Sequence, residues 1–276
     1  MDKSLALVVP VYDGYPEAKK DLDNLMVSIK EGATDLVCDV ILSMDSCHRI
    51  FEAEYRSKYP NATVLNHSGN RKNFCGNVNS GLREAFNKGY EGALLVNQDT
   101  ILPAWHFLKR LTQSPFTGLC SARSLAFKED IELPTKLFTL GSKTDGSALN
   151  PTDIKDLPAN KFAGFCYFYP RSVMEKVGFL DEYNFRAGFD DDDIIVRTLL
   201  AGFSCGIVDV WVEHKGSHID QEKTGQSRSG AYATSDLGIH MSKYYRKWSI
   251  PGNVGHDKAI AWILQNYVWA EELKIA

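Results

Sequence analysis

The first hundred residues alternate between short apolar runs and amphipathic stretches, which constrains the fold more than any other feature of the sequence. Residues 5–11 form an unbroken apolar run rich in valine, as in a strand of a parallel sheet covered on both faces. Residues 19–30 instead repeat their apolar side chains three and four apart, the spacing of a helical stripe. The predicted strands are residues 5–11, 39–44, 61–66 and 93–96, and the predicted helices between them are residues 19–30, 51–59 and 73–88. This order predicts an α/β fold with a Rossmann-like, doubly wound and mainly parallel sheet.

An aspartate closely follows three of the four predicted strands. These residues are Asp13, Asp45 and Asp99. Because ligands of doubly wound sheets bind at the carboxyl ends of the strands, we expect the three side chains to line a ligand site. For a lone aspartate such as Asp99, the position by itself favours a role as the N-cap of the next segment.

The second half of the sequence is less regular. Residues 128–160 are rich in Pro, Lys, Asp and Thr, which predicts a hairpin or an extended loop. Residues 215–235 are polar and glycine-rich, which is typical of either a lid over an active site or a passive surface loop. The remaining predicted elements are strands at residues 162–170 and 205–212 and helices at residues 188–202, 237–248 and 256–273.

Four consecutive aspartates, Asp190 to Asp193, open the predicted helix at residues 188–202. Carboxylates favour a helix N-terminus, but so many like charges within one turn repel one another unless cations or hydrogen-bond donors compensate them. His214, just past a predicted strand, would by itself more often be structural. Combined with a carboxylate such as Asp99 and with phosphate oxygens, it would complete an octahedral site suited to Mg²⁺ or Mn²⁺. Such a cation neutralises the charge that develops on a diphosphate leaving group.

The composition argues against several kinds of partner. The 31 basic and 35 acidic residues give a net charge of −4, so nothing favours a polyanion such as nucleic acid. The N-terminal apolar run LALVVP is too short for the core of a signal peptide, and no window reaches the roughly 18 apolar residues of a membrane helix. The six cysteines are dispersed without a C-x-x-C pair, as expected of buried thiols in a reducing compartment. We therefore expect a cytoplasmic globular enzyme or binding protein.

Several segments match the motifs of one known enzyme family. They are LALVVPVYDG, VILSMDSC, NHSGNRKNFCGNVNSGLREAFNKG with its Asn79-Ser80-Gly81 at a helix start, LLVNQDTIL, FLDEYNFRAGFDDDDIIVRTLLAGFSCGIVDVWVEHKGS and YYRKWSIPG. In these segments, which span about residues 5–250, the sequence resembles the family 2 glycosyltransferases of GT-A fold. The resemblance is greatest to the bacterial and viral branch that includes rhamnosyltransferases. It implies a GT-A domain with acceptor-side elements and closing helices towards the C-terminus.

The resemblance implies a nucleotide site in the first half of the chain. Pro10, Tyr12, Asp13 and Asp45 would hold the nucleoside, with Asp45 accepting a hydrogen bond from a nucleobase N–H. Arg71 would contact a phosphate or the base, and Asn97 falls at the first position of the family's D-x-D motif, beside the nucleotide. The donor would be a UDP- or dTDP-linked sugar.

The resemblance also implies the catalytic groups. Asp99 and His214 would bind the Mn²⁺ or Mg²⁺ ion that bridges the two phosphates. Asp191 would be the base that takes a proton from the acceptor hydroxyl as its oxygen attacks the anomeric carbon. Asp190 and Gly164 would contact the acceptor or the donor sugar. The expected outcome is inversion at the anomeric carbon in a single displacement, with a glycan or glycoconjugate as the acceptor.

Two positions depart from the family pattern. Asn97 replaces the first carboxylate of D-x-D, as it does in the branch resembling rhamnosyltransferases, where Asn-Pro-Asp is frequent. Asp190 replaces a glutamate, and its carboxylate is therefore set back by roughly one C–C bond, which changes the hydroxyl that it reaches.

Two other kinds of protein remain as alternatives. A nucleotidyltransferase would also have a doubly wound sheet with metal-binding carboxylates, but residues 12–14 stand where it would need a glycine- and arginine-rich loop. A non-catalytic sugar-nucleotide or glycan-binding module would have no use for the base at Asp191. For the leading hypothesis we expect a catalytic domain at residues 1–236, split into a nucleotide half (1–100) and an acceptor half with the lid (101–236), and a helical extension at residues 237–276.

Overall fold

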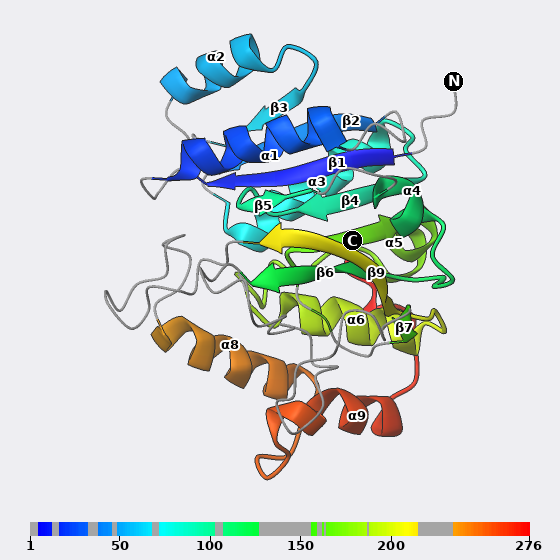
Figure 1. Ribbon diagram of the computed structural model, residues 1–276. Coiled ribbons are helices and arrows are strands. Elements are labelled where there is room, and N and C mark those ends of the chain that lie inside the picture. The colour runs from blue at the N-terminus through cyan, green and yellow to red at the C-terminus, as the bar shows by residue number, and fades with distance from the viewer. Residues whose placement is uncertain are drawn as a thin grey trace.

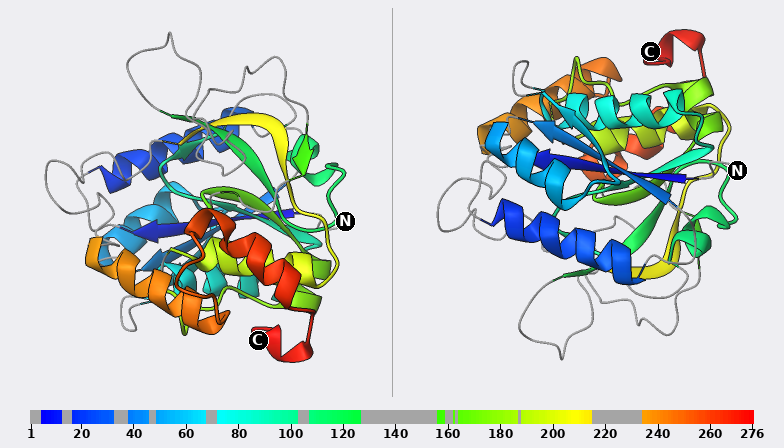
Figure 2. Two further views of the ribbon diagram at one scale, coloured as in Figure 1. Left: turned by 90° about the horizontal axis from the view of Figure 1, so that it is seen from below. Right: turned by 90° about the horizontal axis from the view of Figure 1, so that it is seen from above.

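A nine-stranded sheet runs through the middle of the molecule, and helices cover both of its faces (Figures 1 and 2). The computed structural model describes residues 5–12, 17–32, 38–45, 49–67, 72–102, 107–126, 156–158, 162, 164–186, 188–214 and 234–276. The strands are β1 (Leu5–Tyr12), β2 (Cys38–Asp45), β3 (Thr63–Asn66), β4 (Gly92–Val96), β5 (Thr100–Ile101), β6 (Cys120–Ala126), β7 (Leu157–Pro158), β8 (Cys166–Pro170) and β9 (Gly206–His214). The helices are α1 (Ala18–Gly32), α2 (Arg49–Lys58), α3 (Phe74–Asn87), α4 (Phe107–Thr112), α5 (Arg171–Val177), α6 (Asp190–Leu200), α8 (Thr234–Lys247), α9 (His256–Asn266) and the short 3₁₀ helix η2 (Glu271–Leu273).

The first four strands form the parallel part of the sheet, in the order β3-β2-β1-β4. Every strand and helix predicted in this half is present, with ends that differ from the prediction by a few residues at most. The expected α/β fold with a doubly wound sheet is therefore confirmed. The helix predicted from the apolar pattern at residues 73–88 is α3, where the Asn73 side chain caps the helix by accepting a 2.9 Å hydrogen bond from the Gly76 N–H. The helix start that the resemblance implies at Asn79 is wrong, because Asn79 lies inside α3.

The second half of the sheet mixes strand directions. β8 lies antiparallel between β4 and β6, whereas β9 runs parallel to β6. The short strands β5 and β7 both pair antiparallel with β9. The predicted strand at residues 162–170 begins only at Cys166, and the predicted helix at 256–273 ends at Asn266. Of the loop predicted at residues 128–160, only residues 156–158 lie within the described part of the chain.

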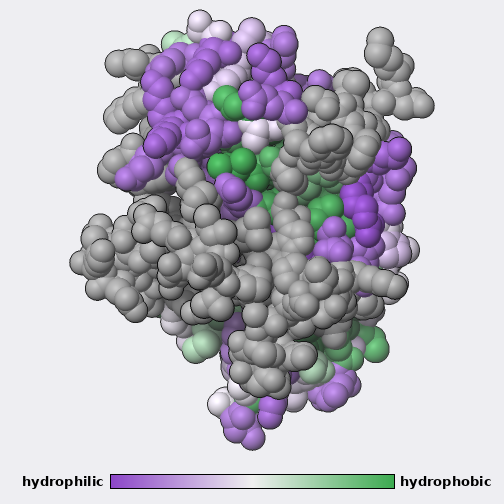
Figure 3. All heavy atoms as spheres, in the orientation of Figure 1, coloured by the Kyte–Doolittle hydropathy of each residue, from purple (hydrophilic) through white to green (hydrophobic). Residues whose placement is uncertain are grey.

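Two apolar clusters fill the space between the sheet and its helices. Side chains of β1 alternate between the two clusters, with Ala6 and Val8 in one and Leu7 and Val9 in the other. The first cluster lies under α3, α6, α8 and α9, and the second lies under α1 and α4 (Figure 2). Hydrophilic side chains gather over α2, at the top of the view in Figure 3. Burial on both faces explains why β1 is apolar along almost its whole length.

The C-terminal helices share the first of these clusters. Tyr244 and Trp248, at the end of α8, and Ile260 and Ile263 of α9 are buried in it together with residues of α6. The division of the chain at residue 236 stays a prediction. In the described part of the chain, none of the helices combines the length and apolar character needed to span a bilayer. The five described cysteines are free thiols.

Candidate functional site

The carboxyl ends of β1 and β2 present two of the predicted nucleotide-binding residues side by side. Tyr12 pairs with Asp45 in the parallel register, and Pro10 lies buried two residues earlier in β1. Asp45 is 6% exposed, and its Oδ1 accepts a 2.8 Å hydrogen bond from the backbone N–H of Lys72, just before α3. The fold therefore holds the Asp45 carboxylate at the edge of the sheet where ligands of doubly wound folds bind.

Gln98 is a residue of this edge that the sequence analysis missed. Its Oε1 accepts from the Tyr12 N–H at 2.5 Å, and its Nε2 donates to the Tyr12 carbonyl at 3.0 Å and to the Ala18 carbonyl at 3.3 Å. The buried amide thus closes the end of β1 against the turn that follows β4. A glutamine between Asn97 and Asp99 was the only signal in the sequence, and its partners are more than 75 residues away.

Asp99 and His214, the two predicted metal ligands, lie together. The Nε2 of His214 is 3.3 Å from the Oδ1 of Asp99, and both side chains are largely buried. Strand pairing explains the contact, since Thr100 of β5 lies opposite His214 of β9. Phe165 stacks on the imidazole with ring centroids 4.6 Å apart and an interplanar angle of 13°, which fixes the orientation of the ring.

Two adjacent residues, Gly164 and Phe165, join the predicted metal ligands to the predicted base. The Gly164 N–H donates a 3.2 Å hydrogen bond to the Oδ2 of Asp191. The Phe165 carbonyl accepts a 2.8 Å hydrogen bond from the Asn97 N–H, while its ring stacks on His214. A side chain at position 164 would crowd the predicted base, because a Cβ built there lies 3.3 Å from the Asp191 Cβ. This turn therefore brings the ends of β4, β8, β9 and α6 into one site.

The four aspartates at the start of α6 have different surroundings. Asp192 is buried and its Oδ2 lies 3.0 Å from the Nε2 of His256 on α9. Asp193 is fully buried against Arg197. Asp190 is buried as well, and burial raises its pKa to about 6. Only Asp191 is half-buried, and its Oδ1 accepts a 2.9 Å hydrogen bond from the Asp192 N–H.

The backbone enters α6 in an unusual conformation. Phe189, the N-cap, has φ 64° and ψ −1°, the left-handed region that a bulky residue rarely adopts. Its ring is held by Tyr244 of α8 at 5.5 Å and by the edge of His256 at 4.9 Å. The C-terminal helices therefore stabilise the strained turn that directs Asp190 and Asp191.

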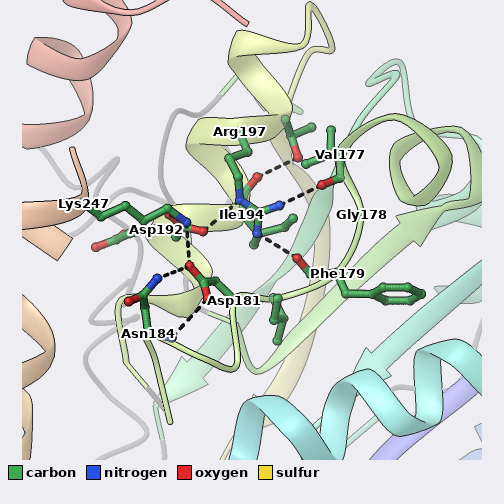
Figure 4. A network of polar contacts seen from close by, with 12 residues as sticks. Val177, Gly178, Phe179, Asp181, Asn184, Asp192, Ile194, Arg197 and Lys247 are labelled. Carbon is green, nitrogen blue, oxygen red and sulfur yellow. Dashed lines mark hydrogen bonds and ion pairs between the residues drawn. The ribbon is translucent and has the colours of Figure 1, made fainter. Parts of the chain in front are cut away.

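A buried polar network joins α6 to α8 and to the residues around the end of α5 (Figure 4). Arg197 donates to Asp193 at 2.8 Å and to the backbone carbonyls of Val177 and Phe179 at 2.9 and 2.8 Å. Lys247 of α8 lies 2.8 Å from both Asp193 and Asp181. These charge-assisted bonds compensate the aspartates that the sequence crowds into one turn.

Some predicted residues lie outside the described part of the chain. They are Asp13, Arg71 and residues 215–233 of the predicted lid; the last two residues of that segment, 234 and 235, begin α8. The aromatic residues Phe162, Phe165 and Tyr167 are buried in the core, while Tyr183 is 91% exposed.

The residues at the end of β4 suit a divalent cation. Among the described residues, no group of three or more His, Cys, Asp or Glu side chains could hold a metal ion. Asp99 and His214 form a pair, and they would supply two of the ligands of an octahedral set. Two residues before Asp99, the Oδ1 of Asn97 is buried with no hydrogen-bond partner in the described structure. The carboxylate of Asp99 and the imidazole of His214 are ligand types that Mn²⁺ accepts.

Comparison with known proteins identifies the fold. No family model and no curated sequence matches the chain. S. aureus TarS 1–349, solved in complex with UDP-GlcNAc, is similar in structure with a TM-score of 0.55 at 14% identity, over 95% of this chain and 71% of that one. GalNAc-T7, solved with UDP, GalNAc and Mn²⁺, is similar with a TM-score of 0.59 at 11% identity, over 87% of this chain. The chain spans about half (54%) of the length of that GalNAc-T7 structure. At these identities the likeness concerns the fold, and the chain has the GT-A fold of glycosyltransferases.

Proposed function

We propose that this chain is an inverting glycosyltransferase that transfers a sugar from a UDP- or dTDP-linked donor to a hydroxyl of a glycan or glycoconjugate. The proposal includes the resemblance to the rhamnosyltransferase-like branch of family 2 and a cation-assisted single displacement. The observation that carries it is the position of Asp191, the one half-buried carboxylate among the four that open α6.

The neighbours of Asp191 support its role as the base. Asp192 and Asp193 are engaged with His256 and with Arg197, and such buried pairs serve structure rather than proton transfer. Asp191 instead receives hydrogen bonds from two backbone N–H groups, of Gly164 and Asp192, which aim its carboxylate without a competing cation in those two bonds. A carboxylate held in this way suits proton abstraction from a hydroxyl.

The proposed reaction conserves every atom. The acceptor oxygen forms a bond to the anomeric carbon while the bond from that carbon to the diphosphate oxygen breaks on the opposite face. The acceptor proton passes to Asp191, and the displaced nucleotide leaves as a diphosphate. Asp190, whose pKa of about 6 leaves it partly protonated near neutral pH, would hydrogen-bond a sugar hydroxyl beside it.

The first half of the chain would hold the donor. Tyr12 and Asp45 would contact the nucleoside at the carboxyl edge of the sheet, with Pro10 and Asn97 beside them. TarS and GalNAc-T7 were both solved with UDP or a UDP-sugar, which supports a uridine nucleotide as the first donor to test.

Asp99 and His214 would hold the cation, and Mn²⁺ accompanies UDP in the GalNAc-T7 structure. When bound, the cation supplies positive charge next to the diphosphate, which favours its departure. The two ligands are themselves kept in place by β5 pairing with β9 and by the Phe165 ring.

A donor panel combined with one substitution tests the proposal. We expect release of the nucleoside diphosphate from one member of a set of UDP-, dTDP- and GDP-sugars in the presence of Mn²⁺. Asp191→Asn should lower transfer by about 10²- to 10⁴-fold with donor affinity nearly unchanged, since it removes only the base. Asp192→Asn is the matched control, and it should keep transfer within about tenfold of the original rate, because proton abstraction accounts for the larger loss.

Other outcomes point to other functions. Tight nucleotide-sugar binding without turnover of any donor would favour a binding module, and release of pyrophosphate from a sugar phosphate and a nucleoside triphosphate would favour a nucleotidyltransferase. Equal losses of binding and transfer in Asp191→Asn would remove that residue from the role of base.

A further inference from the structure

His67 stands in line with the predicted nucleoside-binding residues. Tyr12 pairs with Asp45, and in the neighbouring pair of strands Met44 pairs with Asn66, so the register places His67 level with Asp45. The His67 N–H donates to the Met44 carbonyl at 3.0 Å, which continues the pairing one residue past the end of β3. Tyr12, Asp45 and His67 therefore form a row across the carboxyl edge of three adjacent parallel strands.

The hydrogen-bond partners of Ser43 favour one tautomer of the His67 imidazole. The Ser43 hydroxyl has one proton, and the backbone carbonyl and the Oδ1 of Asn77 lie 2.8 and 2.7 Å from its oxygen. Both are nearer than the Nε2 of His67, at 3.2 Å, which favours the tautomer in which the imidazole donates to Ser43. In the neutral ring, the other nitrogen, Nδ1, is then a hydrogen-bond acceptor.

The surroundings keep this imidazole neutral. Burial lowers the pKa of His67, the positive charge of Lys72 lowers it further, and the Asp45 carboxylate opposes them. Within the described part of the chain, Ser43 is the only side chain that hydrogen-bonds the ring. Ser43 is fully buried on the α3 side of the sheet, so the ring is anchored from beneath.

We propose that His67 is a specificity-determining residue of the nucleotide site, which accepts at Nδ1 a hydrogen bond from an N–H or O–H group of the nucleoside. The inference rests on the proposed function, because it requires a nucleotide at this edge. Asp45 and His67 together offer two acceptors next to each other, so the preferred nucleoside has two donors on this side. In a uridine nucleotide these are the base N3–H and a ribose hydroxyl, and in a guanosine nucleotide two base N–H groups.

Two substitutions separate the acceptor from a structural role. In His67→Asn the amide oxygen takes the position of Nδ1 but the contact with Ser43 is lost. In His67→Gln the amide nitrogen takes the position of Nε2 and keeps a donor to Ser43, but nothing replaces Nδ1. We expect the affinity for UDP, measured by calorimetry with Mn²⁺ present, to fall about tenfold in His67→Gln and less than about threefold in His67→Asn, the effect of one hydrogen bond.

The ligand reveals which donor group His67 binds. If the affinity of 2′-deoxy-UDP is the same for His67→Gln as for the original chain, the group is the ribose 2′-hydroxyl. If the tenfold loss persists with 2′-deoxy-UDP, the group belongs to the nucleobase or to the 3′-hydroxyl. GDP is titrated in parallel, and a loss of GDP affinity in His67→Gln that exceeds the loss of UDP affinity would indicate a second N–H group of the guanine base. Each of these results supports the acceptor role.

The opposite ranking overturns the inference. A larger loss in His67→Asn than in His67→Gln, or equal losses in both, would mean that His67 only packs against Ser43, and unchanged affinity in both would remove it from the site. If the original chain binds neither UDP nor dTDP, the proposed function fails and this inference fails with it. Unchanged affinity in the variants of a chain that binds UDP would instead leave the proposed function intact.

Discussion

Arg56 in the first half of the chain and Arg197 in the second each pair with a carboxylate four residues earlier in the same helix. The distance from Nε to the carboxylate oxygen is 2.8 Å in both pairs, with Glu52 and with Asp193. The Arg56 side chain is 52% exposed, whereas Arg197 and Asp193 are completely buried. The same local pattern in sequence therefore gives a surface pair in α2 and the centre of a buried network in α6.

The difference reflects how each half is built. The first half repeats a strand and a helix along the chain, and apolar strand faces hold it together, so its surface charges carry little energy. In the second half, Arg197 ties α6 to the carbonyls of Val177 and Phe179, and Lys247 ties it to α8. Polar bonds between distant segments thus position α6, whose first residues include the predicted base.

The largest expected effect on stability is the loss of Arg197. Arg197→Met should lower the free energy of unfolding by about 3–5 kcal/mol, because buried Asp193 loses its guanidinium partner and two backbone carbonyls stay buried without their donor. Arg56→Met is the matched control and should cost no more than about 1 kcal/mol. Urea unfolding followed by circular dichroism measures both. Similar costs at the two positions would contradict the difference between the halves.

The next effect is a pH dependence at Asp190. The pKa of this buried carboxyl is raised from 3.8 to about 6 in the folded chain, so folding favours its protonated form. The corresponding stability is fully present below about pH 4 and is lost as the pH rises through about 6. The amide that replaces the carboxyl in Asp190→Asn cannot ionise. As the pH rises over this range, the free energy of unfolding of the variant should therefore increase relative to that of the original chain, by roughly 3 kcal/mol in total.

Unfolding curves at several pH values between 4 and 8 check this prediction, since all other groups are common to both chains. A difference between variant and original chain that stays constant with pH would mean that Asp190 ionises as an ordinary aspartate.

Alanine substitutions at two helical glycines should have smaller effects on the free energy of unfolding, destabilising in the first half and stabilising in the second. A Cβ at Gly81 of α3 would lie 2.4 Å from the Cγ1 of Val8, a stiff and buried side chain of β1, whereas a Cβ at Gly238 of α8 would meet nothing within 4 Å. We expect Gly81→Ala to destabilise the chain by about 1–3 kcal/mol and Gly238→Ala to stabilise it by up to about 1 kcal/mol. Thermal melts of the two variants measure the signs. A stable Gly81→Ala chain would show that α3 can move away from β1.

The sequence predicted the first half better than the second for the same physical reason. Each of its strands and helices can be recognised from the spacing of the apolar residues within that element, and all seven predicted elements are present. The elements β5, β6, β7, α4 and α5 were missed. β5 and β7 have only two residues each, β6 carries Arg123 among its buried residues, and the two helices are only six and seven residues long. Their form depends on neighbours far along the chain, which single-sequence patterns do not contain.

The candidate site follows the same rule. Asp45, Asp99 and His214 were found because each stands at or just past the end of a strand, and the structure brings Asp99 and His214 together. Their roles, like that of Asp191, stay predictions. Gln98 and His67 were missed because their partners are distant backbone groups and a serine of another strand, and no motif marks such contacts.

The smallest expected effect on stability is at His214, where the two halves meet at the proposed cation. His214→Ala should cost about 1 kcal/mol of unfolding free energy without metal, because the stacking of the imidazole on Phe165 is the main loss. The apparent affinity for Mn²⁺, titrated by calorimetry at a fixed UDP concentration, should fall at least about tenfold. His256→Ala is the matched control, since His256 also lies next to an aspartate, Asp192, at 3.0 Å, but belongs to the C-terminal helices. Its Mn²⁺ titration should match that of the original chain. If both variants titrate as the original chain does, Asp99 does not share a cation with His214, and strand pairing alone explains their contact.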